Sequence, residues 1–374
     1  MHPNAVSAHP TPAPNRDATV FVNGKFLAQR TTGVQRVAQA LLAAIDADPA
    51  LPAERFVVLA PPQARNPGLR RMVWRRVGPA GLPLHLWEQA ELPWAARGGL
   101  LLSLAGSAPW FSGRCAAMLH DAALWDVPEA YTTGFRLWYR ALFQRLARRA
   151  DVLFTVSAFS GRRLSQVLGR SRITVLRNGA DHLDGVEPHP QVLRRLGLQG
   201  QRFLLTVGSR SPAKNLPMLA EAYARSGLGP EVPLVSVGGG SAGVFASAPE
   251  LTLPPGWIEA GVVDDGDLKA LYGAALALLV PSRHEGFCLP AAEALHEGCA
   301  VMATRATALP ELFGDDVAAW PVDDAAAWAP ALRRLVDDET WRVALVASGQ
   351  RSLGDARWAC TARQLVAAVL PGAA

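Results

Sequence analysis

Short apolar runs alternate with longer helical patterns along the first half of the chain. The apolar runs are rich in Val, Leu and Phe, as buried strands are, and several are followed by a stretch with the periodicity of an amphipathic helix. The expected strands are 18–24, 55–61, 99–106, 115–121, 151–157 and 172–179, and the clearest helices are 33–45 and 158–169. Strands that alternate with helices in this way predict an α/β fold with a doubly wound parallel sheet.

The same alternation begins again after Gln201. Its segments are 202–208, 216–227, 233–240, 256–263, 267–282, 289–298 and 299–305. They predict a second Rossmann-like sheet. The stretch 179–201 between the two halves is rich in turn residues and polar groups, which is typical of a linker. We therefore expect a first domain at 18–185 and a second at 186–354, with the boundary near Val186.

Length and composition agree with two domains. The chain has 374 residues, half of them hydrophobic, and a single core stops growing at about 250–300 residues. No apolar run reaches the roughly 18–20 residues that cross a bilayer. Residues 1–17 lack the basic start and apolar stretch of a secretory signal, so we expect a disordered leader there. The four cysteines are far apart and show no zinc spacing, which favours a reducing cytoplasm without disulfides or a structural metal.

The charge is divided unevenly between the two halves. Residues 1–190 hold 22 Lys and Arg against 13 Asp and Glu, whereas the remainder holds 15 against 19. The first half is therefore strongly basic although the whole chain carries only +5. A basic half indicates an anionic partner, which could be a membrane surface, an acidic substrate or nucleic acid.

The segment 284–298, HEGFCLPAAEALHEG, is the most specific candidate for chemistry. Glu285 and Glu293 lie eight positions apart, in a tight loop and in a helix that we expect to start at Pro290. This arrangement puts loop N–H groups and the positive helix end at the carboxyl edge of a strand, where polyhydroxylated or anionic ligands bind. Glu293 could then accept from the vicinal hydroxyls of a ribose and Glu285 from sugar hydroxyls. A surface Glu and a Glu that merely suits the helix dipole are the alternative.

A second candidate site lies in the segment LLTVGSRSPAKN. An expected strand runs into a Gly and Ser turn, and Lys214 follows six residues after Gly208. Such a turn brings backbone amides close to a diphosphate, and the ammonium balances its charge. Arg210 either shares this task or points to solvent.

The first half offers two further candidates. Gly33 opens a helix directly after the strand 18–24, where its small size would let the helix N–H groups reach a phosphate; a simple cap by Thr32 is the alternative. His120 and Asp121 end an apolar strand, at the edge where a doubly wound sheet presents groups to its ligands.

Together these segments resemble glycosyltransferase family four, the retaining nucleotide-sugar enzymes with the GT-B fold. The resemblance covers about Phe21 to Asp324 and is strongest at 261–315, where order, spacing and residue type agree. It implies two Rossmann-like domains that face a central cleft, the first for the acceptor and the second for a nucleotide sugar. It also implies that the helix 355–374 returns to the first domain.

The resemblance assigns roles residue by residue. Glu293 would bind the ribose, Lys214 the diphosphate, and Glu285 the transferred sugar, with His120 contacting the same sugar near the reacting face. The remaining donor-site residues that it implies are Gly33, Ser209, Arg210, Val262, Val263, Gly286, Phe287, Cys288 and Leu289. Ser209 and Ala213 stand where members commonly carry an Arg, which makes Arg210 a candidate substitute. Val262 and Val263 would meet the base through their backbone.

The resemblance also implies a mechanism and a donor class. Transfer would retain the anomeric configuration by front-face attack, with stabilisation of the departing diphosphate as the main catalytic contribution. No metal or other cofactor is expected. GDP-mannose is the first expectation for the donor, because SRSPAKN and TTGVQR resemble mannosyltransferase-like members, while UDP-sugars and dTDP-sugars stay open.

Two basic, aromatic segments suggest where the acceptor lies. They are 65–77, with Arg70, Arg71, Trp74, Arg75 and Arg76, and 135–150, FRLWYRALFQRLARRA. Their spacing is typical of interfacial helices on an anionic membrane, and a solvated face with buried aromatics is the alternative. We expect a saccharide or lipid-linked saccharide acceptor, an enzyme peripheral to the inner face of the cell membrane, and a role in polysaccharide or glycolipid assembly.

Three other classes fit the sequence less well. A Rossmann dehydrogenase or epimerase would carry G-x-G-x-x-G at its first helix, which is missing here. A nucleotide-binding or membrane-binding protein that had lost its chemistry would lack some of Lys214, Glu285 and Glu293. Nucleic acid is not expected as a partner, since the basic segments show helical spacing rather than an aromatic platform on strands.

Overall fold

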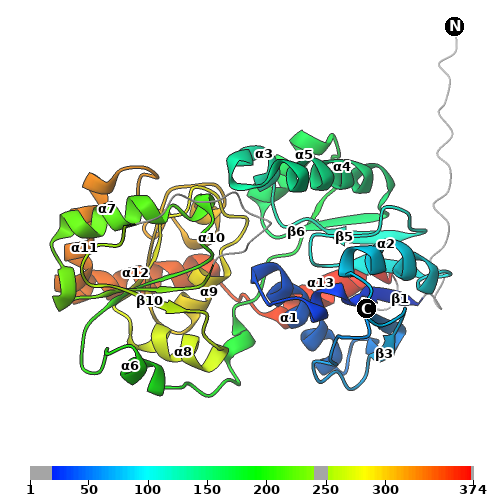
Figure 1. Cartoon of the computed structure of the whole chain (residues 1–374), viewed down its shortest axis with the longest axis horizontal. Coiled ribbons are helices and arrows are strands. Elements are labelled where there is room, and N and C mark those ends of the chain that lie inside the picture. Colours follow the sequence, from blue (N-terminus) through cyan, green and yellow to red (C-terminus); the bar gives the residue numbers. More distant parts are fainter. Residues whose placement is uncertain (1–18, 240–251, 372–374) are drawn as a thin grey trace, which may run out of the picture.

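Two parallel sheets organise the chain. The computed structural model describes residues 19–239 and 252–371, so the leader expected at 1–17 lies outside the described residues. The first sheet has the strand order β3-β2-β1-β4-β5-β6-β7 and the second has the order β10-β9-β8-β11-β12. The expectation of two Rossmann-like parallel sheets is confirmed, and Figure 1 shows the two domains side by side.

The strands of the first sheet are β1 Val20–Asn23, β2 Phe56–Ala60, β3 Val73–Arg76, β4 Leu100–Ser103, β5 Cys115–Met118, β6 Val152–Thr155 and β7 Thr174–Val175. Those of the second are β8 Leu204–Val207, β9 Leu234–Val237, β10 Trp257–Gly261, β11 Ala277–Val280 and β12 Ala300–Ala303. The helices are α1 Gly33–Ala47, α2 Leu84–Ala95, α3 Ala123–Asp126, α4 Thr133–Arg149, α5 Ala158–Leu168, α6 Gln191–Arg195, α7 Leu216–Ser226, α8 Asp265–Ala274, α9 Leu289–His296, α10 Leu309–Phe313, α11 Ala325–Asp337, α12 Glu339–Leu353 and α13 Trp358–Val369.

Helices cover both faces of the first sheet. In β4, Leu101 belongs to the apolar cluster that includes Trp87 of α2 and Leu142 of α4, whereas Leu102 belongs to the cluster that includes Leu41 of α1. Neighbouring side chains of a strand point to opposite faces, so a strand that is buried on both faces is apolar throughout. This explains why the apolar runs here are continuous rather than alternating.

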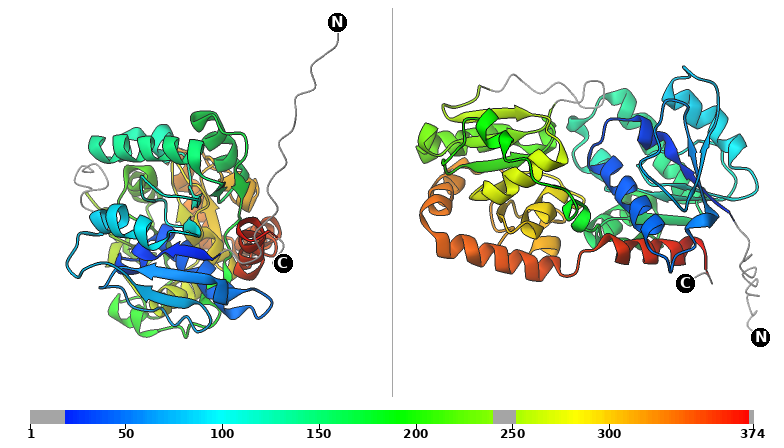
Figure 2. Two further views of the ribbon diagram at one scale, coloured as in Figure 1. Left: turned by 90° about the vertical axis from the view of Figure 1, so that its right-hand side faces the viewer. Right: turned by 90° about the horizontal axis from the view of Figure 1, so that it is seen from below.

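The last helix returns to the first domain. After α12, on the second domain, the chain crosses back and α13 packs along α1, as the red helix in Figure 2 shows. Arg363 of α13 donates to Asp48 at the end of α1, at 2.9 Å. The crossing is tight at Gly179, where a Cβ would lie 2.4 Å from the backbone nitrogen of Trp358. Only glycine permits this approach.

The segment 65–77 is not a helix, so that expectation is wrong. It turns at Gly68 and then forms the edge strand β3 beside β2. The reason is a tertiary one: the buried carboxylate of Asp46 in α1 accepts the backbone N–H groups of Arg70, Arg71 and Met72 at 2.7–2.8 Å. These bonds direct the chain onto the free edge of the sheet. The other basic segment does form a helix, α4.

Candidate active site

The pocket of interest lies at the carboxyl edge of the second sheet. Successive strands run outward from β8 through β9 to β10, and the chain then returns to β11 on the other side of β8. In open α/β sheets, ligands bind where the order reverses in this way. A pocket is present there, and its lining includes Gly208, Ser209, Lys214, Ser236 and Ser282.

Close approach of two loops shapes this pocket. Gly238, which follows β9, has φ +133°, and a Cβ on it would lie 1.9 Å from the carbonyl oxygen of Gly208. Any side chain would separate the ends of β8 and β9. The glycine at 238 therefore brings the backbone after β8 to the pocket, where it can approach a ligand.

Lys214 reaches the pocket from a short 3-10 helix, Pro212–Lys214. The next residue, Asn215, has φ 53°, and its side-chain amide donates to Val322 O and to Asp323 Oδ1, both at 3.0 Å. Asparagine adopts this left-handed conformation more readily than other side chains. The bonds of Asn215 hold the turn that carries Lys214.

Lys214 and Glu285 form an ion pair at the pocket, with 2.6 Å between Nζ and Oε1. Burial by itself lowers the pKa of Lys214, but the charge and hydrogen bond of Glu285 outweigh it and hold that pKa above its ordinary value. Ser282 also donates to Glu285 Oε1 at 2.6 Å. Thr307 brackets the Glu285 backbone, accepting its N–H and donating to its carbonyl, both at 2.9 Å. A charged lysine therefore stands in a fixed place.

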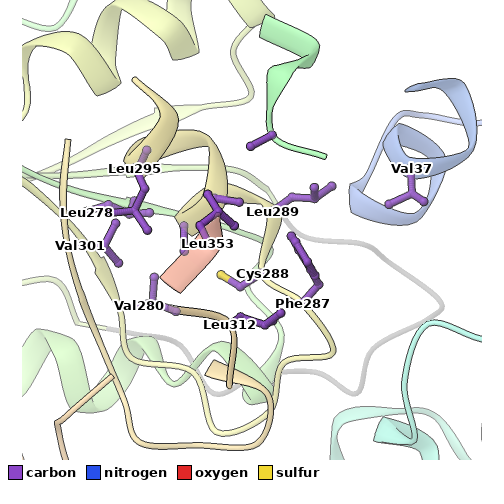
Figure 3. Close-up of a cluster of buried hydrophobic side chains, with 14 of the residues drawn as sticks. Val37, Leu278, Val280, Phe287, Cys288, Leu289, Leu295, Val301, Leu312 and Leu353 are labelled. Atoms are coloured by element: carbon purple, nitrogen blue, oxygen red, sulfur yellow. The ribbon is translucent and has the colours of Figure 1, made fainter. Parts of the chain in front are cut away.

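The loop after Glu285 buries its side chains and leaves its amides free. Phe287, Cys288 and Leu289 belong to the apolar core, and Leu289 points toward α1, on which Val37 lies (Figure 3). Within the described parts of the chain, the N–H groups of Gly286, Phe287 and Cys288 donate to no protein acceptor. Burial raises the pKa of the Cys288 thiol, so this thiol stays protonated. The loop offers a ligand its backbone donors.

Glu293 is 5% exposed on α9 and is held at both oxygens. Tyr272 of α8 donates its hydroxyl to Oε2 at 2.8 Å, and His182 Nε2 lies 2.9 Å from Oε1. Burial and the carboxylate of Glu293 raise the pKa of Tyr272, which keeps its hydroxyl a donor. A carboxylate has about four lone-pair sites, so each oxygen can still accept one more bond.

The first domain contributes His120 to the edge of this site. A Cβ on Gly286 would lie 2.7 Å from the carbonyl oxygen of His120 and 2.9 Å from the Cβ of Asp121, so the two domains touch here. Burial lowers the pKa of His120. Its Nε2–H donates to Leu104 O at 2.9 Å, because a carbonyl oxygen can only accept. Nδ1 is then left as an acceptor.

Two other contacts join the domains around the site. Arg36 of α1 binds Asp265 of α8, with 2.7 Å between Nη1 and Oδ2. Glu311 of α10 accepts the backbone N–H groups of Ala158 and Phe159, each at 2.7 Å. Glu311 thereby caps α5 across the domain boundary, with favourable charge at the helix N-terminus.

Some of the residues expected to bind the sugar donor lie outside the group formed by Lys214, Glu285 and Glu293. Arg210 is mainly exposed and pairs with Glu259 of β10. Val262 is 60% exposed, while Val263 packs partly against the core. Gly33 starts α1 with open space around it, and the backbone N–H of Thr32 donates to Gln35 at 3.2 Å.

The basic residues of 65–77 also lie away from the pocket. Arg71 donates to Asp48 O and Leu51 O at 2.6 and 2.7 Å, which ties it to the end of α1. Trp74 is partly buried against the core. Arg70, Arg75 and Arg76 are exposed at the sheet edge.

Sequence reasoning missed several side chains that hold the site. They are His182, Tyr272, Ser282 and Thr307. His182 lies in the stretch 179–201, where the sequence indicates only a linker rich in polar groups, so no signal there singled it out. Ser282 lies three residues before Glu285 in the same loop, so it could have been found from its spacing. Tyr272 and Thr307 come from other parts of the chain, and nothing in their spacing indicates the contact.

Comparisons with known proteins agree on the kind of protein. Residues 192–352 match the family model described as glycosyl transferases group 1. The O-antigen chain mannosyltransferase B of Escherichia coli is 31% identical over 266 residues, covering 67% of this chain and 69% of that protein. The D-inositol 3-phosphate glycosyltransferase of Corynebacterium efficiens is 31% identical over 316 residues, covering 73% and 72%.

A solved structure shares the whole architecture. Sucrose-phosphate synthase from Thermosynechococcus elongatus superimposes with a TM-score of 0.70 at 19% identity, over 93% of this chain and 97% of that chain. The expected GT-B fold is confirmed. Among the described residues, no helix is both long and apolar enough to span a membrane.

Proposed function

This chain belongs to the glycosyl transferases group 1 and is a glycosyltransferase, and we propose that it moves a hexose from a nucleoside-diphosphate sugar to a saccharide or lipid-linked saccharide. The observation that carries the proposal is the Lys214–Glu285 ion pair, which lies where the strand order of the second sheet reverses. Beside it lie the free amides of the loop 286–288. This set suits a ligand with an anionic end and a hydroxylated end.

Each group has a part in the proposed reaction. The ammonium of Lys214 binds the diphosphate and stabilises its charge as the bond to the anomeric carbon breaks. Glu285 then accepts from sugar hydroxyls, while the loop amides bind sugar oxygens. The acceptor hydroxyl attacks from the face that the diphosphate leaves, and a diphosphate oxygen takes its proton, so the product retains the anomeric configuration. Positioned charges of this kind contribute most where charge develops in the transition state.

The proposed donor is GDP-mannose. Support comes from the likeness to an O-antigen chain mannosyltransferase, together with the segments SRSPAKN and TTGVQR. A UDP-sugar or dTDP-sugar enzyme of the same family is the alternative. The base would meet Val262 and Val263 through their backbone, a kind of contact that several bases can make.

A donor screen tests the proposal. Thermal unfolding and donor hydrolysis are measured with GDP-mannose, UDP-glucose, UDP-galactose, UDP-N-acetylglucosamine and dTDP-rhamnose, using the wild type, Lys214→Ala and Glu293→Ala. We expect one donor to stabilise the wild type and to be hydrolysed slowly, with both effects lost in the variants. Stabilisation by a UDP-sugar alone would replace GDP-mannose by the alternative. No response to any of the five donors would count against the proposal.

We propose that neither a metal nor another cofactor takes part, because Lys214 and the loop amides supply the charge that a metal supplies in other transferases. A chelator should therefore leave the transfer rate unchanged. The measurement is initial rate with EDTA and after readdition of Mg²⁺ or Mn²⁺. Transfer activity that disappears with EDTA and returns with either ion would overturn the proposal that no metal takes part.

We further propose that the first domain binds the anionic inner surface of the cell membrane. The contact would be made by α4 and by the neighbouring residues Trp110 and Phe111. The sequence of α4 contains five Arg and no acidic residue. Leu137 and Trp138 of α4 are 59% and 43% exposed. The ring of Trp138 lies 5.6 Å from that of Trp110, whose neighbour in the sequence, Phe111, is 74% exposed. Arg145 lies over the rings of Trp110 and Phe111. Exposed aromatic side chains with nearby cations suit the boundary of an anionic bilayer.

Co-sedimentation with vesicles tests this surface. We expect binding to phosphatidylglycerol vesicles but not to phosphatidylcholine vesicles, weakened by salt. The double variant Phe111→Ser, Trp138→Ser should bind about tenfold more weakly, because it loses two apolar anchors. Val343→Ser is the matched control, because Val343 is an apolar residue of α12 in the second domain and its 62% exposure lies between those of Trp138 and Phe111. Loss of binding only in Arg75→Ala, Arg76→Ala would move the contact to the edge strand β3.

A further inference from the structure

A line of buried side chains joins Glu293 to the place where the chain crosses between the domains. Trp358 Nε1 lies 3.2 Å from His182 Nδ1, and His182 Nε2 lies 2.9 Å from Glu293 Oε1. The side chain of His182 is 8% exposed and Trp358 is 4% exposed. His182 belongs to the 3-10 helix Asp181–Leu183 on one crossing, and Trp358 begins α13 on the other.

The chemistry of these groups fixes the direction of each bond. An indole N–H can only donate, so His182 Nδ1 accepts from Trp358. The ring proton is therefore on Nε2 and is donated to the carboxylate of Glu293. Trp358 thus selects the tautomer of His182 that can hold Glu293.

Trp358 is itself held firmly. Its backbone N–H donates to Asp181 Oδ1 at 2.9 Å, and Ala180 N donates to Ala356 O at 2.7 Å. A side chain at Gly179 would collide with this backbone, as the tight approach described above shows. The indole is therefore placed by the crossing and not by the donor site.

His182 and Tyr272 take one lone pair from each oxygen of Glu293. The carboxylate cannot rotate without breaking one of these bonds, and its remaining lone pairs keep a fixed direction. Two neighbouring hydroxyl groups of a ribose need two acceptors in such a fixed relation. His182 and Tyr272 would therefore act on the ribose through Glu293.

We propose that His182 is a positioning residue for the ribose of the donor, with its tautomer set by Trp358 of the crossing helix. The inference rests on the proposed role of Glu293 in ribose binding. It makes the strength of ribose recognition depend on His182 and Trp358, which lie on the two crossings between the domains and act through Glu293.

The test compares a nucleoside diphosphate with the form that lacks both ribose hydroxyls. Dissociation constants for GDP and 2′,3′-dideoxy-GDP are measured by calorimetry on the full chain, and the UDP pair replaces them if the donor screen selects UDP. We expect the wild type to bind GDP about tenfold or more tightly than the dideoxy form, because the ribose hydroxyls would donate hydrogen bonds to the charged carboxylate of Glu293. His182→Ala should reduce this preference to about threefold or less.

A purely structural role would weaken both nucleotides equally and leave the preference intact, which would overturn the inference. His182→Gln, whose amide N–H can still donate to Glu293, should keep most of the preference and tests the idea even if His182→Ala unfolds. Trp358→Phe, which keeps an aromatic ring but removes the indole N–H donor, should give a preference between those of His182→Ala and His182→Gln. If the wild type binds GDP without any preference over the dideoxy form, the ribose role of Glu293 fails and this inference fails with it. Donor hydrolysis then still tests the transferase function separately.

Discussion

Lys214→Ala is expected to lower kcat by about 100-fold to 1,000-fold, the usual effect of losing one preorganised charge at a departing oxyanion. Lys214 is the cation that lines the pocket and is paired with Glu285. Its raised pKa keeps it charged at neutral pH, so it offers full charge to the diphosphate. The donor KM should change much less than kcat, because the charge on the leaving group grows during bond breaking.

Steady-state kinetics with the donor that the screen identifies measure this change. Lys214→Arg keeps the charge and should retain part of the activity, limited by the size of the guanidinium. Arg225→Ala is the matched control, since it removes an exposed cation of α7 that pairs with Glu221 one turn earlier. A kcat for Lys214→Ala within about threefold of the wild type would contradict the assignment of Lys214 to the leaving diphosphate.

Gly286→Ala is the second change for which we expect a large effect. Its Cβ would lie 2.7 Å from a backbone oxygen of the opposite domain, that of His120, and backbone cannot move aside as a flexible side chain can. The two domains must then separate slightly at the site. Because displacement of reacting groups by about 1 Å can cost about 100-fold in rate, we expect kcat/KM to fall by roughly that factor.

The same substitution should hardly change the unfolding temperature, since Gly286 has an ordinary φ and the clash lies between domains rather than within a core. Gly273→Ala is the control: it lies in α8 with no atom within 4 Å of the added Cβ, and alanine is the better helix former. Small-angle X-ray scattering with and without donor would show whether the variant fails to close. A wild-type value of kcat/KM in Gly286→Ala would contradict the expectation that the reaction depends on the close approach of Gly286 to His120.

The parallel sheets could be predicted because their signal is local. Continuous apolar runs such as 55–61 and 115–121 are buried on both faces, and each becomes a central strand, β2 and β5. Where burial is partial, the pattern failed. In 65–77 Arg and Trp follow helical spacing, yet the chain forms the edge strand β3 because Asp46, about 25 positions earlier, binds its backbone. No local pattern records such a contact.

The candidate site divides in the same way. The spacing of Glu285 and Glu293 and the lysine after Gly208 are each contained in one short segment of the chain, so the sequence indicated them. The bond between Lys214 and Glu285 spans 71 positions, and that between His182 and Glu293 spans 111. Arg210 shows the converse, because its nearness to Lys214 in the sequence suggested a shared role, whereas in space it pairs with Glu259.

By itself, the sequence determined the two α/β domains, the carboxyl-edge loops and the residue types that they present, since periodicity and short spacing are set along the chain. Only the tertiary structure decided which side chains meet. It placed Gly286 against His120, capped α5 with Glu311 of the other domain, and joined Trp358, His182 and Glu293 into one line. Those contacts depend on how the domains pack and where the last helix returns, and packing brings together residues whose separation along the chain carries no trace of it.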